Sequence, residues 1–550
     1  MSYGNHKHQD NHHKRKHNHH KNCNKLIVEL ISDLDFDYRK DDGYGNNKNH
    51  PTWGKAGEQL LRTAPSSYPD GKSEPSGKNR PSARVISNEI FSQTKSVPNP
   101  QKASNIFWLH GQILDHLLDL TPEENPIESF NILVPTGDPY FDPLSTGTQV
   151  IPLNRSIYDP NTGLVNPRQQ INLITSFIDC SNIYGSDEHR NKYCRHHVNG
   201  KMSLSEGKML PYNNGTMNNA GGKGTGLYVA GDIRANENLA LTAMHTLWVR
   251  EHNYWAELLK EYNPCETDEN IYQKARAIVE AEFQVITYNE FLPLLLGNKM
   301  QKYNEYNKNV NPSISNEFST AAYRLGHSLV SKEFKRLDNN GKEIWAGNIS
   351  LRDAYFSPWK LTNEGGIDPI LKGMASGLAE KLDSKVIDDL RNFLFGDPGK
   401  GGLDLVSLNI QRGRDHGLAD YNTTRESYGL KRVVSFDQIT SNNSTVQKLK
   451  MLYENVDDID LWVGILVEDP VSKGMTGELC TAIIRDQFER VRDGDRFWYE
   501  HRFPKKLRRL LRKTKLSDII LRNTGIKNLQ ENVMLLECDC KCKCKHHTKN

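Results

Sequence analysis

The sequence predicts a mostly α protein with long loops and little β structure. Apolar residues recur at three- and four-residue spacing in several long segments, whereas strand-like alternation is short and rare. Two stretches rich in Gly, Asn or Pro, 200–226 and 395–403, indicate long loops. The most periodic segments, each expected to be a helix, are 106–120, 238–262, 271–292 and 318–330.

The composition predicts a folded enzyme-sized unit and excludes fibrous and wholly disordered classes. Of 550 residues, 36% are hydrophobic and 25% are charged, and 17 Phe, 22 Tyr and 8 Trp can build a core. No run of about 18 apolar residues occurs, so we expect no transmembrane segment. The formal net charge of +3 argues against a dedicated partnership with nucleic acid.

The two ends differ in composition from the middle. The first 25 residues hold seven His and six Lys or Arg without an apolar stretch, so we expect a disordered tail over 1–35 and no secretory signal peptide. Localisation is left open. Residues 535–550 alternate Cys with charged residues, a spacing unlike that of structural zinc sites, and we expect a second tail without a dedicated metal. One continuous domain is expected over 36–534.

Two segments carry side chains suited to acid–base chemistry. On a helix, Gln112 and His116 share one face, with Asp115 beside them. A neutral His near a carboxylate can move protons, although a hydrogen-bonded core His is commoner. Arg234 and Glu237 precede the next strong helix, where they form either a plain ion pair or a charged fork aimed into a cavity.

Two later segments suggest how an iron cofactor would be held. His327 lies on an apolar helix face, beside Gly326, which would permit close approach of a planar ligand. The alternative is a core His. Asn409 could accept the free imidazole N–H of such a ligand, and Arg412 could pair with a carboxylate or belong to a surface Arg–Asp network.

The segment TSFIDCS gathers oxygen donors of a kind that a hard cation prefers. In an extended backbone the side chains at alternating positions would point to the same side. Their hydroxyls and carboxylate, with backbone carbonyls, suit Ca²⁺. Any strand shows such alternation, so the pattern alone is weak evidence. The four positions are Thr175, Phe177, Asp179 and Ser181.

Taken together, these segments resemble the animal-type haem peroxidase family, part of the peroxidase–cyclooxygenase superfamily. The resemblance spans nearly the whole middle of the chain and is closer to bacterial and peroxinectin-like members than to the mammalian secreted enzymes. It implies a single large domain organised around haem b. The matching segments, in family order, are GQILDH, TSFIDCSNIYGS, AGDIRANENLALTAMHTLWVREHN, TAAYRLGHSLV and LNIQRGRDHGLADYN.

The resemblance implies a role for each matching residue. His116 would be the distal acid–base group, with Gln112 and Arg234 in the same cavity. His327 would be the proximal iron ligand. The remaining positions would serve the haem: Asn409 orients the ligand, Arg324 and Arg412 lie near the haem periphery, and Asp115 and Glu237 could form ester links to the haem. The position after Glu237 is Asn238, so we expect no sulfonium link.

One departure from the family pattern concerns calcium. The family usually has Asp directly after the distal His, where this chain has Leu117. The loop part of the site, Thr175 to Ser181, is intact. Losing one carboxylate weakens a Ca²⁺ site, so the resemblance leaves calcium binding evenly balanced.

The activity that the resemblance implies is reduction of hydrogen peroxide with oxidation of a halide or a small organic donor. One alternative is a haem fatty-acid dioxygenase, but those enzymes carry a Tyr three residues before the proximal His, where this chain has Arg324. Cyclooxygenases also lack the distal Arg, kept here as Arg234. A second alternative is a non-catalytic adhesion or structural protein with the same fold. The sequence indicates neither the donor nor the oligomeric state.

Overall fold

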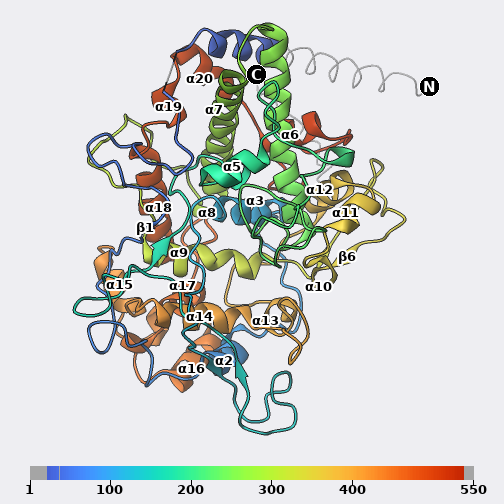
Figure 1. Cartoon of the computed structure of the whole chain (residues 1–550). Helices are drawn as coiled ribbons and strands as arrows, with labels where there is room; N and C mark the ends of the chain where they lie inside the picture. Colours follow the sequence, from blue (N-terminus) through green and yellow to red (C-terminus); the bar gives the residue numbers. More distant parts are fainter. Residues whose placement is uncertain (1–21, 36, 538–550) are drawn as a thin grey trace, which may run out of the picture.

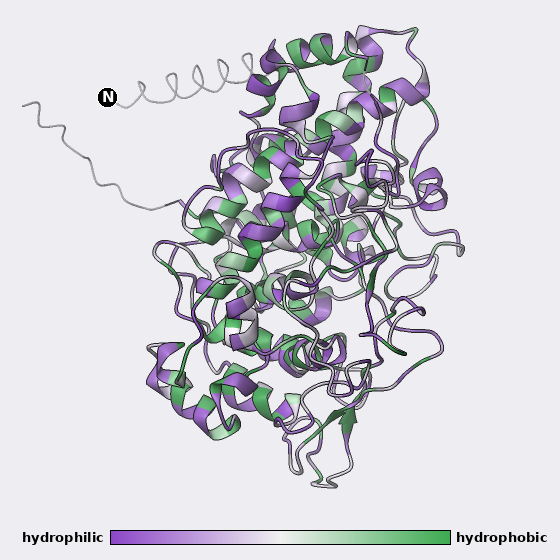
Figure 2. Cartoon of the chain, turned by 90° about the vertical axis from the view of Figure 1, so that its left-hand side faces the viewer, coloured by the Kyte–Doolittle hydropathy of each residue, from purple (hydrophilic) through white to green (hydrophobic). Residues whose placement is uncertain are grey.

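The computed structural model describes residues 22–35 and 37–537, and within them helices dominate (Figure 1). The helices carry hydrophobic and hydrophilic faces (Figure 2). One continuous hydrophobic core runs from Ile27 to Met534, as the predicted single unit requires. The longer helices are α3 (Asn105–Asp115), α6 (Leu239–Tyr262), α7 (Asp268–Ile286), α12 (Ile367–Ser376), α14 (Leu405–Asp415), α16 (Asn443–Leu452) and α18 (Glu478–Asp493).

Shorter helices join these elements. They are α2 (Ala83–Ile86), α4 (Ser181–Tyr184), α5 (Glu188–Cys194), α8 (Leu292–Leu296), α9 (Asn316–Thr320), α10 (Leu351–Ala354), α11 (Trp359–Asn363), α13 (Asp388–Arg391), α15 (Tyr421–Ser427), α17 (Leu461–Val467), α19 (Tyr499–Arg502), α20 (Lys505–Leu511) and α21 (Leu516–Asn523). Single turns of 3-10 helix are η2 (Glu206–Lys208), η5 (Phe436–Gln438) and η6 (Val456–Asp458), and a π-helical turn is η1 (Ser87–Phe91).

Strands are few and short in the described residues, as predicted. Each of three antiparallel pairs has two residues per strand, and all serve to pin loops rather than to form a layer. The pairs are β1 (Glu58–Gln59) with β4 (Ile171–Asn172), β2 (Ile132–Leu133) with β3 (Val150–Ile151), and β5 (Glu333–Phe334) with β6 (Ile349–Ser350).

Helices α6 and α7 form the main packed pair and confirm the predicted segments. Asn238 caps α6, accepting a hydrogen bond from the backbone N–H of Leu241 at 2.9 Å. The predicted helix 271–292 continues past α7 through a π-helical turn, η3 (Thr287–Phe291). There the Leu292 N–H bonds to the Thr287 carbonyl, immediately before Pro293, which has no N–H to donate.

Two predicted helices have different backbones from those expected. The helix predicted over 106–120 ends at Asp115, with His116 as its C-cap. Leu117 and Leu118 prolong the apolar pattern because both are buried in the turn that follows. The segment 318–330 breaks at Ala321 (φ −130°) and continues as a 3-10 helix, η4 (Ala322–Leu329). Its apolar spacing does not distinguish a 3-10 from an α helix.

The prediction of a disordered tail is wrong for residues 22–32. Residues 22–32 form a helix, and Ile27, Val28 and Ile31 lie in the core with at most 3% of their surface exposed. An apolar cluster in LIVELI supplies this packing, although the His-rich composition before it predicted disorder for all of 1–35. Residues 1–21 and 538–550, which hold the rest of both predicted tails, lie outside the described residues. No helix in the described ranges is apolar enough over its length to span a bilayer.

Candidate active site

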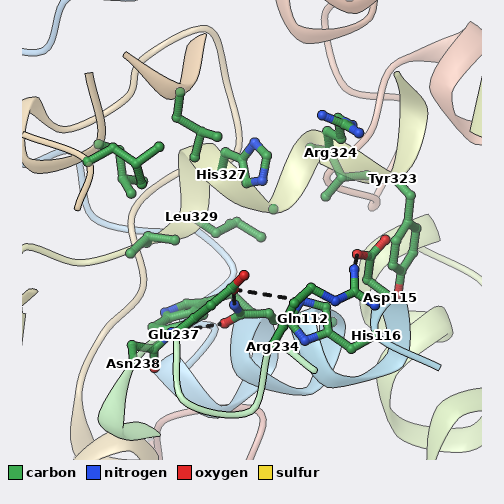
Figure 3. A pocket seen from close by; sticks show the side chains of 18 of the residues that line it. Gln112, Asp115, His116, Arg234, Glu237, Asn238, Tyr323, Arg324, His327 and Leu329 are labelled. Carbon is green, nitrogen blue, oxygen red and sulfur yellow. Dashed lines mark hydrogen bonds and ion pairs between the residues drawn. The ribbon is translucent and has the colours of Figure 1, made fainter. Parts of the chain in front are cut away.

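A cavity of about 370 Å³ lies between α3 and η4 and brings most of the predicted site residues together (Figure 3). We call it the central cavity. Most of its polar groups lie on the wall formed by α3 and the segment before α6, and η4 forms the facing wall with Arg324 and His327. Much of the remaining lining is apolar, including Phe107, Trp108, Phe291, Leu329, Leu351, Leu390, Leu394 and Leu405.

His116 lies in this wall as a neutral imidazole. Gln112 is one turn earlier on α3, and the His116 N–H bonds to its carbonyl at 3.1 Å. Burial, and then the positive charge of Arg234, hold the pKa of His116 well below its usual value. The Nε2 atom lies 3.9 Å from Glu237 Oε2, and Nδ1 lies 3.6 Å from Asp232 Oδ1. A neutral imidazole at neutral pH is able to accept a proton.

Arg234 is fixed beside His116 by a buried carboxylate. Its Nε and Nη2 each donate to Asp232 at 2.9 Å, and Nη2 also donates to the Asp119 carbonyl at 3.0 Å. The Nη1 atom lies 3.8 Å from Asp115 Oδ2. The fork therefore presents a fixed positive charge to the central cavity, where a developing negative charge would be stabilised.

Two acidic side chains at the predicted ester positions also line the cavity. Burial raises the pKa of Glu237 to about 7 and raises the pKa of Asp115 above its usual value. The Gln112 Nε2 donates to Glu237 Oε2 at 3.4 Å, and Gln112 Oε1 accepts from Asn238 at 3.4 Å. Gln112 thus links the two segments that form this wall.

His327 projects from η4 on the facing wall (Figure 3). Burial, with a smaller effect of Arg324, lowers its pKa to about 3, so its imidazole is neutral. Asn409 Nδ2 lies 2.7 Å from His327 Nδ1, and Asn409 Oδ1 accepts from Arg324 Nη1 at 3.1 Å. The amide therefore turns its donor toward the imidazole, whereas the sequence led us to expect an acceptor. Turning the amide over would exchange the two roles.

The two predicted peripheral arginines lie in different surroundings. Arg324 lines the central cavity. Arg412 is not among the lining residues. Its Nη1 donates to the Asn154 carbonyl at 2.7 Å and to Asp415 Oδ2 at 3.0 Å, which is the Arg–Asp network considered above.

The predicted calcium loop is closed by its own hydrogen bonds. Thr175 Oγ1 donates to Asp179 Oδ2 at 2.7 Å, and the Ser181 N–H donates to Asp179 Oδ1 at 2.9 Å. The Ser181 hydroxyl donates to the Leu117 carbonyl at 3.3 Å, and the Leu117 side chain is fully buried. Asp179 is thus the one carboxylate of the predicted set. In the described part of the chain, no three His, Cys, Asp or Glu side chains cluster as metal ligands would.

The sequence assigned no role to several polar residues of this region. Asp232 is 2% exposed and contacts both Arg234 and His116. Asp119 lines the cavity, and burial together with the Asp115 carboxylate raises its pKa well above the usual range. Its spacing of four residues from Asp115 was the available signal for Asp119. Tyr323 also lines the cavity, with its ring stacked on Phe318 at 4.7 Å.

The central cavity fits haem by its own chemistry. A neutral imidazole faces a polar wall across an apolar space, which is how a haem ligand and a distal acid–base group are arranged. A Cβ built on Gly326, next to His327, would meet no atom within 4 Å. The chain therefore leaves room beside the imidazole for a flat ligand.

Comparisons with known proteins identify the family of the chain. The family model for animal haem peroxidase matches residues 38–534. The chain is 36% identical to peroxinectin A of Dictyostelium discoideum over 92% of this chain and 97% of that protein. It is 35% identical to peroxidasin of Drosophila melanogaster over 84% of this chain, but it spans only 34% of that longer relative.

Solved structures extend the agreement to the fold. Peroxidase A from Dictyostelium discoideum superposes with a TM-score of 0.85 at 34% identity, covering 91% of this chain and all of that one. A fatty acid alpha-dioxygenase of Arabidopsis thaliana, at 21% identity over 93% of this chain and 87% of that one, shares the fold with a TM-score of 0.76. Because the family model covers most of the chain, the chain belongs to the animal haem peroxidase family, and this membership implies haem binding.

Proposed function

We propose that this protein is a haem peroxidase that reduces hydrogen peroxide and oxidises a halide or a small organic donor. The observation that carries the proposal is the opposition of two neutral imidazoles, His116 and His327, across one cavity that also holds Arg234. The haem b that we expect there would bind His327 through its iron and supply the redox chemistry.

The chain itself would handle protons and charge. His116 Nε2, on the cavity side of the ring, accepts a proton from hydrogen peroxide and returns it to the departing oxygen, which leaves as water. Arg234 stabilises the negative charge that develops as the O–O bond breaks. Gln112, tied to Glu237, holds a polar edge of the cavity in place for the peroxide.

The dioxygenase alternative finds less support. Three residues before His327 stands Arg324, and the neighbouring Tyr323 is packed against Phe318. A tyrosyl group in the expected position is therefore lacking. The non-catalytic alternative would be favoured by loss of a cavity group, but His116, Arg234 and His327 all line one cavity.

We also propose that Asp115 and Glu237 form ester links to the haem. Both carboxyls line the cavity, so each would lie beside a haem bound there. Forming each ester would oxidise a haem methyl group by two electrons, with hydrogen peroxide as the oxidant, and the hydrogens lost from the methyl and the carboxyl would leave in water. Extraction with acidified acetone, after exposure to hydrogen peroxide, measures the link: covalently bound haem stays with the polypeptide.

For calcium, we propose that the loop Thr175–Ser181 keeps its shape without the ion. Both Asp179 oxygens already accept hydrogen bonds. Leu117 has a buried hydrocarbon side chain at the position where the family usually has a carboxylate. With a single carboxylate, the set offers too little negative charge for tight binding of a hard dication.

The test of the proposed activity is expression with haem followed by an absorption spectrum and a donor-oxidation assay with hydrogen peroxide. We expect a Soret band and peroxide-dependent turnover, and we expect His327→Ala to lose the band while the protein stays folded. A folded wild-type protein that takes up no haem would overturn the proposal.

A further inference from the structure

Asp232 is a buried carboxylate that contacts two polar residues of the central cavity, Arg234 and His116. Its Oδ1 accepts from the backbone N–H of Arg234 at 2.8 Å and from Arg234 Nε at 2.9 Å, and its Oδ2 accepts from Nη2 at 2.9 Å. Such a two-pronged pair holds a guanidinium plane in one orientation. Asp232 therefore sets the orientation of the Arg234 guanidinium.

The same carboxylate faces the back of the distal imidazole. His116 Nδ1 lies 3.6 Å from Asp232 Oδ1, is buried and has no hydrogen-bond partner. This distance is longer than a hydrogen bond, but a buried N–H left unpaired is costly, and a small movement of the ring would close the gap. An ionised carboxylate accepts only, so the proton belongs on Nδ1 and the bare Nε2 faces the cavity.

We propose that Asp232 is a positioning residue of the peroxidase site, which keeps His116 Nε2 free to accept a proton and holds the Arg234 fork beside it. The inference rests on the proposed function. Asp232 does not line the central cavity and would act through His116 and Arg234, which do. Carboxylates that orient an imidazole in this way serve many catalytic histidines.

The backbone around Asp232 is itself fixed. The Asn182 carbonyl accepts from the Asp232 N–H at 3.1 Å and lies 3.1 Å from Nδ1 of the buried His245 on α6. A Cβ at the preceding Gly231 would lie 2.2 Å from the Ser181 carbonyl oxygen. Only glycine allows this approach, so the carboxylate is anchored to the neighbouring loop.

The charges that face His116 predict the direction in which its pKa changes when Asp232 is replaced. Asp232 favours the protonated imidazole, whereas Arg234 and His245 disfavour it, and Glu237 lies 3.9 Å from Nε2. Burial is the largest single influence on Asp232 and opposes its ionisation, but the charge and hydrogen bonds of Arg234, together with His116 and His245, hold the pKa of that carboxyl below its usual range. Removing the Asp232 charge should therefore make His116 a weaker base.

The test is binding of cyanide to the haem-loaded protein, followed by the shift of the Soret band between pH 4 and 8. Hydrogen cyanide must give up its proton to the distal base, so the association rate reports on His116 without turnover. We expect Asp232→Asn to keep its haem, to bind cyanide about 10- to 100-fold more slowly, and to move the acid limb of the rate profile to lower pH.

Asp460→Asn is the matched control. Asp460 is also buried and accepts from Nε and Nη2 of Arg414 at 2.9 and 2.8 Å, and from Arg80 and Tyr453 as well, but it does not line the cavity. This control should leave the cyanide rate and its pH profile unchanged. Wild-type values in Asp232→Asn would overturn the inference.

If Asp232→Asn fails to fold, Asp232→Glu keeps the charge and displaces it by one methylene. We expect slower cyanide binding with an acid limb near that of the wild type, and an unchanged rate would overturn the inference. A wild-type protein without a Soret band would instead reject the proposed function, so the two failures are distinguishable.

Discussion

The Asn409 amide lies 2.7 Å from His327 Nδ1 and is held from its other side by Arg324. The contact joins η4 to α14, which are 82 residues apart at this point. It fixes the plane of the imidazole before any cofactor binds. Orientation of a ligating histidine by a hydrogen-bonding neighbour is a general determinant of metal affinity.

Asn409→Leu should weaken haem binding by about 10- to 100-fold, because it removes the partner of His327 Nδ1 while keeping a similar volume. Spectral titration of the haem-free protein with haem measures the affinity. Asn422→Leu is a suitable control, since Asn422 is a buried asparagine whose amide donates to the Val433 carbonyl and to Asp457 and not to His327. Equal affinities of the two variants would contradict this role of Asn409.

Arg234→Ala should keep the Soret band but slow the reaction with hydrogen peroxide by about 10²- to 10³-fold, as expected for loss of a fixed charge-stabilising donor. Stopped-flow absorption at the Soret maximum measures this step. Arg432→Ala controls for loss of an arginine, because Arg432 forms exposed pairs with Glu426 and Asp457. A normal rate in Arg234→Ala would mean that the fork has another role.

Glu237 should make stability fall as pH rises. Its pKa is about 7 in the fold and near 4.5 in the unfolded chain, so the folded state binds the proton more tightly. Its contribution is fully present below pH 4.5 and is lost as pH rises to 7. Melting temperatures of the haem-free protein should therefore show Glu237→Gln gaining on the wild type across this window. A constant difference between pH 4.5 and 7 would disprove the assignment.

Leu117→Asp should create a calcium site beside Asp179. The wild-type melting temperature should not respond to a chelator, whereas the variant should be destabilised without calcium and recover with it. Leu118→Asp, a buried neighbour outside this set, should be destabilised with no recovery. A chelator-sensitive wild type would show that the loop binds calcium without the missing carboxylate.

The sequence predicted the helices whose periodicity and caps lie within a single segment. Helix α6 was predicted nearly to the residue because its apolar periodicity is unbroken and Asn238 caps it. The end of α3 was missed because Leu117 is buried whether the chain continues as a helix or turns. The helix at 22–32 was missed because its short apolar cluster follows a strongly polar stretch.

Contacts between distant segments could not be read from the sequence in the same way. His116 and Arg234 come from elements over a hundred residues apart, and only the family resemblance suggested that they meet. Asp232 contacts both, yet its sequence neighbourhood shows no more than an acid near an arginine. The orientation of the Asn409 amide depends on Arg324, which takes its oxygen and leaves its nitrogen for His327. No local sequence pattern indicates that these two residues share one amide.

The fit of Gly231 against Ser181 has a consequence for how this protein tolerates change. Its missing methyl group lets the predicted calcium loop and the Asp232 carboxylate share one rigid support. A change in the loop that moves Ser181 should therefore also displace Asp232 and, through it, His116 and Arg234. A redesign of that loop is therefore expected to change the reactivity of the central cavity at the same time.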